Sequence, residues 1–287
     1  MAGMTLAQSS KLTNDTLQAG VVETMATESK LLAVLPFMNV EGHGYSYNVE
    51  TSMGEAQFRN VKEGYNASEI GTNRETEYLT ILGDEAVVDT FQMEVHSNIN
   101  DLMAVETALK SKAIAHKYEK TFINGTGESK DFKGLLARVK GTAQEIKATE
   151  DLVSDIDELL DMVQGGADAL IMNKKTRREL TAKARAYVTY KHNEFGKQVA
   201  YFGDVAIVDV ESEIVADGYV LAVKFGVHEA VAGLQSKSGV MVKKLGELGE
   251  TPNVKTRIEW FCGMAVFNPK AVAVRNPNSE MVAKAKR

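Results

Sequence analysis

The longest regular pattern of apolar and polar positions in the chain lies between residues 97 and 124. Its apolar residues fall mostly three and four positions apart, which is the period of an α-helix with one buried face. Ser97 or Asn98 can accept hydrogen bonds from the free N–H groups at the start, and Asn124-Gly125 supplies a left-handed residue that ends the helix. At about 1.5 Å per residue the segment is on the order of 40 Å long, so we predict a spine helix.

Two short runs of alternating apolar and polar residues precede this helix. Residues 45–51 (YSYNVET) and 76–82 (TEYLTIL) have the period-two pattern of β-strands. Between them lies the polar stretch GEAQFRNVKEGYNASEIG, residues 54–71, so the whole forms a hairpin of about 40 residues, whereas common hairpin loops have two to five. Because a two-stranded ribbon is marginally stable alone in water, we expect its apolar partner surface to lie outside its own fold.

Residues 1–40 begin polar and then become helical in pattern, with apolar residues spaced raggedly along a moderately apolar face. Pro36 ends any helix there, because the residue before a proline is pushed away from helical angles. We therefore expect this segment to form an arm rather than part of the core.

The second half of the chain alternates helical and strand-like patterns. An amphipathic helix is predicted over 151–164, a strand over 167–172, and a basic helix after an Asn173 cap. Further strands are predicted over 199–210, 218–225, 239–245 and 254–275, the last with a bend at Asn268-Pro269. Helices and strands do not follow the even period of a doubly wound sheet, so the pattern predicts an α+β fold, or two α/β lobes.

Composition and charge exclude several classes of function. A chain of 287 residues has room for one elaborate domain or two, and its net charge of −6 argues against a protein that depends on wide contact with DNA phosphates. No stretch reaches the roughly 20 apolar residues of a membrane span, and the first residues lack the features of a signal peptide, so we expect no membrane partner and a cytoplasmic site of synthesis. Cys262 is the only cysteine and is expected to pack in a strand.

Residue types that carry catalysis, metals or cofactors are not arranged for such chemistry. The histidines have no metal-binding spacing, and the common hydrolase, nucleotide-binding and zinc-protease signatures are absent, so we predict no enzyme, no metal and no cofactor. NGTGESK, residues 124–130, ends a helix instead of opening one, so it is interpreted as a helix cap rather than a phosphate loop. The acids of residues 151–161 are interpreted as a solvated helix face. The basic residues Lys174, Lys175, Arg177 and Arg178 are interpreted as a solvated or inter-subunit face.

The order of these parts resembles the major capsid proteins of tailed bacteriophages, with the Hong Kong 97-type shell fold. The resemblance rests on INGTG (residues 123–127) and FKGLL after the spine, ADALIMNKKTRREL as a strand running into a helix, FGDVAIV as a hairpin, and the closing run with Asn268-Pro269-Lys270-Ala271. It covers nearly the whole chain.

This resemblance implies a division of the chain into five parts. They are an N-terminal arm (1–40), an extended loop hairpin (41–82), a peripheral domain with the long spine helix (83–130 and 252–276), an axial domain (131–251) and a C-terminal tail (277–287). The extended loop would lie across a neighbouring subunit and bury its apolar residues there. The inter-subunit contact residues expected on the loop are Phe58, Arg59, Val61, Lys62, Tyr65 and Ile70.

The implied function is that of a structural major capsid protein. Copies would assemble as hexamers and pentamers into an icosahedral phage head enclosing double-stranded DNA, which is contacted non-specifically on the inner face. A separate scaffolding protein and a portal protein are implied partners, and the virion, assembled in the bacterial host cytoplasm, is the implied location. Some relatives join the loop to a neighbour through a bond between Lys and Asn side chains. Lys62 lies in a suitable loop, but no matching Asn stands out, and we do not expect the bond.

Two other interpretations remain open. Encapsulins, which are bacterial nanocompartment shells, share this fold and approximate length but enclose cargo enzymes rather than DNA. An α/β enzyme with a small-molecule site in the middle region belongs to a different class and would be a monomer or dimer rather than a shell.

Overall fold

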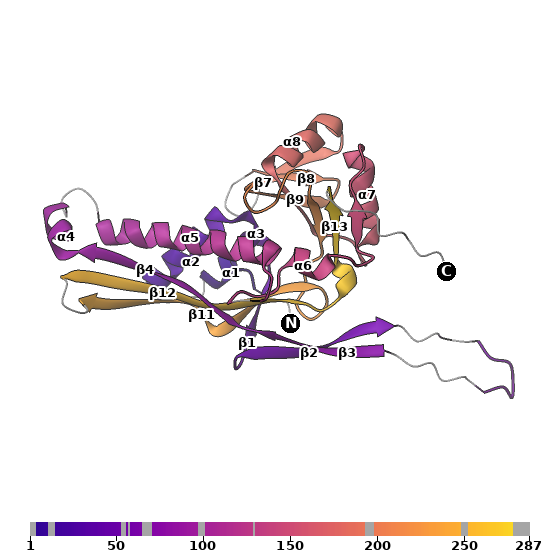
Figure 1. Ribbon diagram of the computed structural model, residues 1–287, viewed down its shortest axis with the longest axis horizontal. Helices are drawn as coiled ribbons and strands as arrows, with labels where there is room; N and C mark the ends of the chain where they lie inside the picture. The colour runs from indigo at the N-terminus through magenta and orange to yellow at the C-terminus, as the bar shows by residue number, and fades with distance from the viewer. Residues whose placement is uncertain are drawn as a thin grey trace.

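The computed structural model describes residues 4–10, 15–52, 56, 58–64, 71–96, 101–128, 130–192, 198–247 and 252–277. Within these residues the chain forms a four-stranded sheet, a seven-stranded sheet and a separate two-stranded ribbon, with helices packed on both larger sheets (Figure 1). The predicted α+β class is therefore confirmed. No helix of the described residues combines the length and apolar character needed to span a bilayer.

The four-stranded sheet and the spine helix form the elongated part of the molecule (Figure 1). The strand order is β1 (Phe37–Val40), β11 (Val231–Glu247), β12 (Asn253–Val266) and β4 (Thr80–Asp89). Neighbouring strands are antiparallel except β1, which runs parallel to β11. The spine helix α5 (Leu102–Asn124) lies along β4 and β12, and Trp260 of β12 packs against Tyr118 with ring centroids 4.6 Å apart. Cys262 is buried in β12, as predicted.

The two ends of α5 differ in detail from the prediction. The helix begins at Leu102, and the Asp101 carboxylate accepts a hydrogen bond from the Ala104 N–H at 3.1 Å. The predicted caps Ser97 and Asn98 lie outside the described residues. At the other end Gly125 has φ −55°, so the prediction of a left-handed residue there is wrong. Glycine is needed instead for close packing, because a Cβ at Gly125 would lie 2.1 Å from the Phe132 carbonyl oxygen.

The N-terminal segment is part of the core, so the prediction of an arm is wrong for its described residues, 4–10 and 15–40. It forms α1 (Leu6–Ser10), α2 (Thr16–Glu28) and α3 (Lys30–Val34) before β1. The apolar pattern is ragged because the helix breaks at Ser29, whose hydroxyl accepts a hydrogen bond from the Leu32 N–H at 3.2 Å. Each short helix then turns its own apolar side chains into the main core. These buried residues are Leu6, Val21, Val22, Met25, Leu31, Leu32 and Leu35.

The seven-stranded sheet forms the second part of the molecule. Its strand order is β5 (Glu145–Lys147), β13 (Val272–Asn276), β10 (Val220–Val223), β6 (Ala169–Asn173), β9 (Val205–Val210), β8 (Gln198–Phe202) and β7 (Val188–His192). Helices α7 (Leu152–Met162) and α8 (Lys174–Lys183) pack on it and bury a second apolar cluster. The Asn173 side chain caps α8, as predicted, by accepting from the Thr176 N–H at 2.7 Å.

The closing run of the chain joins the two sheets. Strand β12 belongs to the four-stranded sheet, a short 3-10 helix (Pro269–Ala271) follows, and β13 continues in the seven-stranded sheet. The predicted bend at Asn268-Pro269 is therefore confirmed. The remaining helices are α4 (Thr90–His96), before the spine, and α6 (Leu135–Val139), after it.

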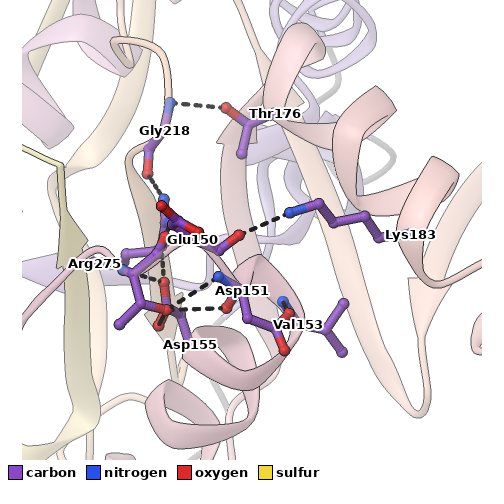
Figure 2. A network of polar contacts seen from close by, with 9 residues as sticks. Glu150, Asp151, Val153, Asp155, Thr176, Lys183, Gly218 and Arg275 are labelled. Carbon is purple, nitrogen blue, oxygen red and sulfur yellow. Dashed lines mark hydrogen bonds and ion pairs between the residues drawn. The ribbon is translucent and has the colours of Figure 1, made fainter.

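A buried ion pair fastens α7 to β13 (Figure 2). Arg275 Nε donates to Asp155 at 2.6 Å, and the other two guanidinium nitrogens donate to the carbonyl oxygens of Gly218 and Thr149. Thr149 donates its hydroxyl and its N–H to the same carboxylate. Burial acts to raise the pKa of Asp155, but the hydrogen bonds from Thr149 and Arg275 outweigh it and the pKa is lowered. The prediction of a solvated acidic face is therefore wrong for Asp155.

Candidate functional site

The base of the long hairpin is packed on its own chain. Strands β2 (Gly44–Ser52) and β3 (Gly71–Tyr78) pair antiparallel, from Gly44 opposite Tyr78 to Ser52 opposite Gly71. The predicted second strand divides at Leu79, where the chain leaves the ribbon and enters the four-stranded sheet as β4. A small apolar cluster lies under the ribbon, so the expectation of no apolar surface within the fold is wrong for the base. The cluster comprises Met38, Val40, Tyr47, Val49, Leu234 and Ala265.

Polar contacts fix the orientation of this base. Arg138 of α6 forms a largely buried ion pair with Glu77 of β3, with Nη1 and Oε1 2.6 Å apart. The Tyr47 hydroxyl donates to Glu75 at 3.4 Å, and burial raises the pKa of Tyr47. A cavity of about 430 Å³ lies beside these residues, between β3 and α6. The ribbon therefore leaves the body of the molecule in a defined direction (Figure 1).

The hairpin tip, by contrast, has apolar side chains with no apolar surface beside them among the described residues. Phe58 is 107% exposed and Val61 is 90% exposed. The turn is held by its own polar groups: the Asn60 N–H donates to the Glu63 carboxylate at 2.8 Å, and these hydrogen bonds lower the pKa of Glu63. Lys62 occupies the left-handed region, with φ 73°. The tip thus presents large apolar groups to solvent on a turn whose recorded hydrogen bonds are local.

The structure describes four of the six predicted contact residues. Phe58, Arg59, Val61 and Lys62 lie together at the tip and are all exposed. The Arg59 guanidinium donates to the Glu63 carbonyl oxygen at 3.3 Å. Tyr65 and Ile70 lie outside the described residues.

A second exposed apolar surface lies at the opposite end of the molecule. Phe91 and Val95 of α4 and Val105 and Leu109 of α5 are each about half exposed or more. Both pairs have the i, i+4 spacing that places side chains on one side of a helix. Figure 1 shows α4 at one end of the long axis and the hairpin tip at the other, so one copy cannot cover this surface with its own tip. Sequence reasoning missed these residues because their spacing is indistinguishable from that of buried positions.

The junction of the spine helix with the N-terminal helices contains a buried carboxyl group. Glu119 of α5 is 4% exposed, and burial raises its pKa to about 7 despite a hydrogen bond with Ser29. Its neighbours include Glu28 of α2, whose carboxylate lies 3.0 Å from Lys112 Nζ, and His116, whose Nδ1 lies 4.0 Å from Glu119. The carboxylates of Asp209 and Glu211 also act to raise the pKa of Glu119.

The described residues offer little reactive chemistry elsewhere. No group of three or more His, Cys, Asp or Glu side chains in the described part of the chain could hold a metal ion. Burial raises the pKa of the Cys262 thiol, which makes it a poor nucleophile. The segment after Asn124 ends the spine helix, as predicted for NGTGESK, and Ser129 within it lies outside the described residues.

Solved structures similar to this chain include an encapsulin complex, a phage structure and a capsid. The holo-SrpI encapsulin complex from Synechococcus elongatus PCC 7942 is similar with a TM-score of 0.67 and 18% identity, over 96% of this chain and 97% of that chain. The structure of Microbacterium phage Oxtober96 has a TM-score of 0.66 and 15% identity, over 87% and 91% of the two chains. The capsid of a native GTA particle has a TM-score of 0.64 and 14% identity, over 88% and 89%. The fold is therefore the Hong Kong 97-type shell fold of phage capsids and encapsulins.

Sequence comparison places the chain within this class. The family model described as SU10 major capsid protein matches residues 6–224. No curated protein sequence is significantly similar to the chain. The chain belongs to the SU10 major capsid protein family and is a structural capsid protein.

Proposed function

We propose that this protein assembles through head-to-tail contacts into hexamers and pentamers, which form the icosahedral head of a tailed phage around double-stranded DNA. Membership of the major capsid protein family supports this function. The observation that carries it is the separation of two exposed apolar surfaces, the hairpin tip and the surface on α4 and α5, at opposite ends of one chain. A contact between unlike surfaces on opposite sides of a subunit generates rings when the rotation closes.

The hairpin is proposed to act as an extended loop that lies across the neighbouring subunit. Its base is fixed by the small apolar cluster and the Arg138–Glu77 ion pair, so its direction is set before association. A preset direction lowers the entropic cost of binding. Phe58 and Val61 then become buried on the neighbour, with Arg59, Lys62, Tyr65 and Ile70 as further contact residues.

The division into an extended loop (41–82), a peripheral domain (83–130 and 252–276) and an axial domain (131–251) remains a proposal, with three adjustments suggested by the sheets. Strand β13 pairs within the seven-stranded sheet, which favours placing residues 272–276 with the axial domain. Strand β11 pairs with β12 in the four-stranded sheet, which favours placing residues 231–247 with the peripheral domain. Helix α2 packs on α5 and β11, which favours placing it there too, whereas α3 contacts both α5 and β9.

Further partners are proposed from family membership alone. They are a separate scaffolding protein, a portal protein and packaged DNA touched non-specifically on the inner face, with the virion as the location and the host cytoplasm as the place of assembly. A structural role of this kind needs no catalytic site, and we propose none.

The tip provides the direct test of this function. Phe58 and Val61 are exposed in the single chain. Phe58→Asp/Val61→Asp should therefore change the free energy of unfolding of the unassembled chain, measured by thermal unfolding, by less than about 0.5 kcal/mol. The same change should abolish closed shells in negative-stain microscopy, because it buries two charges in the proposed contact. Phe58→Leu/Val61→Ile, which keeps the tip apolar, is the matched control and should still assemble. Shells of normal size and yield from the Asp variant would contradict the proposal.

An encapsulin-type nanocompartment is the second candidate, favoured by the similarity to the SrpI encapsulin over 96% of this chain. The two functions predict different contents. Shells purified after nuclease treatment should contain protected double-stranded DNA if the protein builds a phage head, and a second protein without DNA if it builds a nanocompartment.

A further inference from the structure

Two neighbouring helices on the seven-stranded sheet carry opposite charges. Helix α7 and its cap contain five acidic residues and no basic one, namely Asp151, Asp155, Asp157, Glu158 and Asp161. Residues 174–185, which include α8, contain six basic residues and a single acidic one, Glu179. The six are Lys174, Lys175, Arg177, Arg178, Lys183 and Arg185.

Several of these charges are already paired within the chain. Asp155 binds Arg275, as described above. Lys174, Lys175 and Arg177 form ion pairs with Glu211, Asp217 and Asp209 respectively, all on β9 or the segment that follows it. The Lys175–Asp217 pair lowers the pKa of Asp217 and raises that of Lys175. These side chains have structural roles in the lobe.

Lys183 donates to the Glu150 carbonyl oxygen at 2.9 Å, close to the start of α7 (Figure 2). Five of the other charges are exposed to solvent and form two groups. Asp157, Glu158 and Asp161, which we call the acidic flank, are exposed and form no ion pair with any described residue. Arg178 and Arg185, which we call the basic flank, are likewise exposed and unpaired within the described part of the chain. The two helices are adjacent, yet no ion pair joins one flank to the other.

The flanks belong to opposite halves of the sheet. Helix α7 packs on β13 and β10, towards the β5 edge, whereas α8 packs on β6 and β9, towards the β7 edge. Both helices lie on the outer side of this lobe (Figure 1). A chain that carries complementary exposed charges on two helices of one lobe, without pairing them internally, can satisfy both of them with further copies of itself.

We infer that the acidic flank of one copy docks against the basic flank of the next, in a head-to-tail contact between the lobes built on the seven-stranded sheet. This inference rests on the proposed self-assembly and adds a specific surface to it. A polyanion such as DNA is the competing occupant, but it would match only the basic flank and would be repelled by the acidic one. Charges at such a contact select the partner and its register more than they add affinity.

Charge reversal tests the contact. Three variants of the full chain are compared with the original: Asp157→Lys/Glu158→Lys/Asp161→Lys, Arg178→Glu/Arg185→Glu, and the two sets combined. Lys140→Glu/Lys237→Glu changes the net charge as much as the basic-flank variant, at exposed residues outside both flanks. Thermal unfolding by circular dichroism confirms that each chain folds, and sedimentation velocity in 0.15 M salt gives the fraction in closed shells.

Each single-flank variant should lose assembly, with an association constant lower by on the order of tenfold or more, because like charges then face each other. The combined variant should recover shells, and an equimolar mixture of the two single-flank variants should form rings of alternating copies. The control should assemble normally. If a reversed variant fails to fold, Arg178→Gln/Arg185→Gln replaces it and should show weaker assembly than the original chain at low salt.

Other outcomes overturn the inference. Normal shells from both single-flank variants would show that the flanks are merely solvated. A combined variant as defective as the single ones would show that the flanks do not meet each other. Normal shells with reduced DNA content from Arg178→Glu/Arg185→Glu would assign the basic flank to DNA. Failure of the original chain to form any shell would refute the proposed function itself, which is a separate result.

Discussion

Glu119 should make the fold less stable as the pH rises towards neutrality. Its carboxyl group is buried at the junction of α5 with the N-terminal helices, and burial raises its pKa from the ordinary 4.5 to about 7. Between these two values the folded chain binds more protons than the unfolded chain. The free energy of unfolding therefore falls as the pH rises from 4.5 to about 7 and is constant for this group at higher pH.

The magnitude follows from the pKa difference. Each pKa unit corresponds to about 1.36 kcal/mol. A pKa raised from 4.5 to about 7 in the folded chain therefore lowers the free energy of unfolding at pH 8 by about 3 kcal/mol. Glu119→Gln has nearly the shape of the protonated acid and cannot ionise. The free energy of unfolding of the variant should equal that of the original chain at pH 4.5 and should be about 3 kcal/mol higher at pH 8.

The assay is urea denaturation followed by far-UV circular dichroism at pH 4.5 and pH 8, in the Phe58→Asp/Val61→Asp background so that the chain stays unassembled. Glu229→Gln, at an exposed position, is the control and should change stability by less than about 0.5 kcal/mol at both pH values. A Glu119→Gln effect of equal size at both pH values would refute the reasoning, because ionisation of Glu119 would then not be the cause.

Three further predictions concern stability and the hairpin base. Arg275→Met should lower the free energy of unfolding, measured by urea denaturation, by about 3–5 kcal/mol, because it leaves the Asp155 carboxylate buried without its partner. Adding Asp155→Leu should recover most of this loss. An unchanged denaturation midpoint for Arg275→Met alone would contradict the prediction. Gly125→Ala should lower the free energy of unfolding by about 1–3 kcal/mol, because the new Cβ would meet the Phe132 carbonyl oxygen. Gly20→Ala lies inside α2 with open space around it and should raise the free energy of unfolding by up to about 1 kcal/mol. Equal effects of the two changes would show that close packing is not the reason for glycine at position 125. Arg138→Met should increase hydrogen exchange in β3 by releasing Glu77, and unchanged exchange would show that the ion pair does not hold the ribbon.

The parts of the fold that could be predicted are those whose apolar pattern is local and strong. The spine helix and the helix over 151–164 have clear helical periods, and the first ribbon strand, over 45–51, alternates strictly. Strand β11 was predicted only from residue 239 onward, because the irregular pairing between Gln235 and Val240 interrupts the alternation. The helical pattern of the N-terminal segment could be predicted, but its place in the core could not, because the break at Ser29 mixes two helical faces in one sequence pattern.

The candidate surfaces show a different limit of prediction from sequence. The hairpin tip could be predicted because its polar length made it unusual, and the structure places Phe58 and Val61 in solvent as such a tip requires. The surface at the opposite end, with Phe91 and Leu109, could not be predicted, because an exposed apolar residue and a buried one look alike in sequence. The pairing of Asp155 with Arg275 depends on residues 120 positions apart and needs the fold to be known.

We propose above all that the hairpin tip is completed only by another copy of the chain. The most direct measurement is the particle mass, by light scattering, of the full chain and of a chain lacking residues 58–64 in the same buffer. We expect closed shells of many subunits for the full chain, and monomers of about 31 kDa or small oligomers with unchanged thermal unfolding for the shortened one. Equal particle masses for the two chains would contradict the claim.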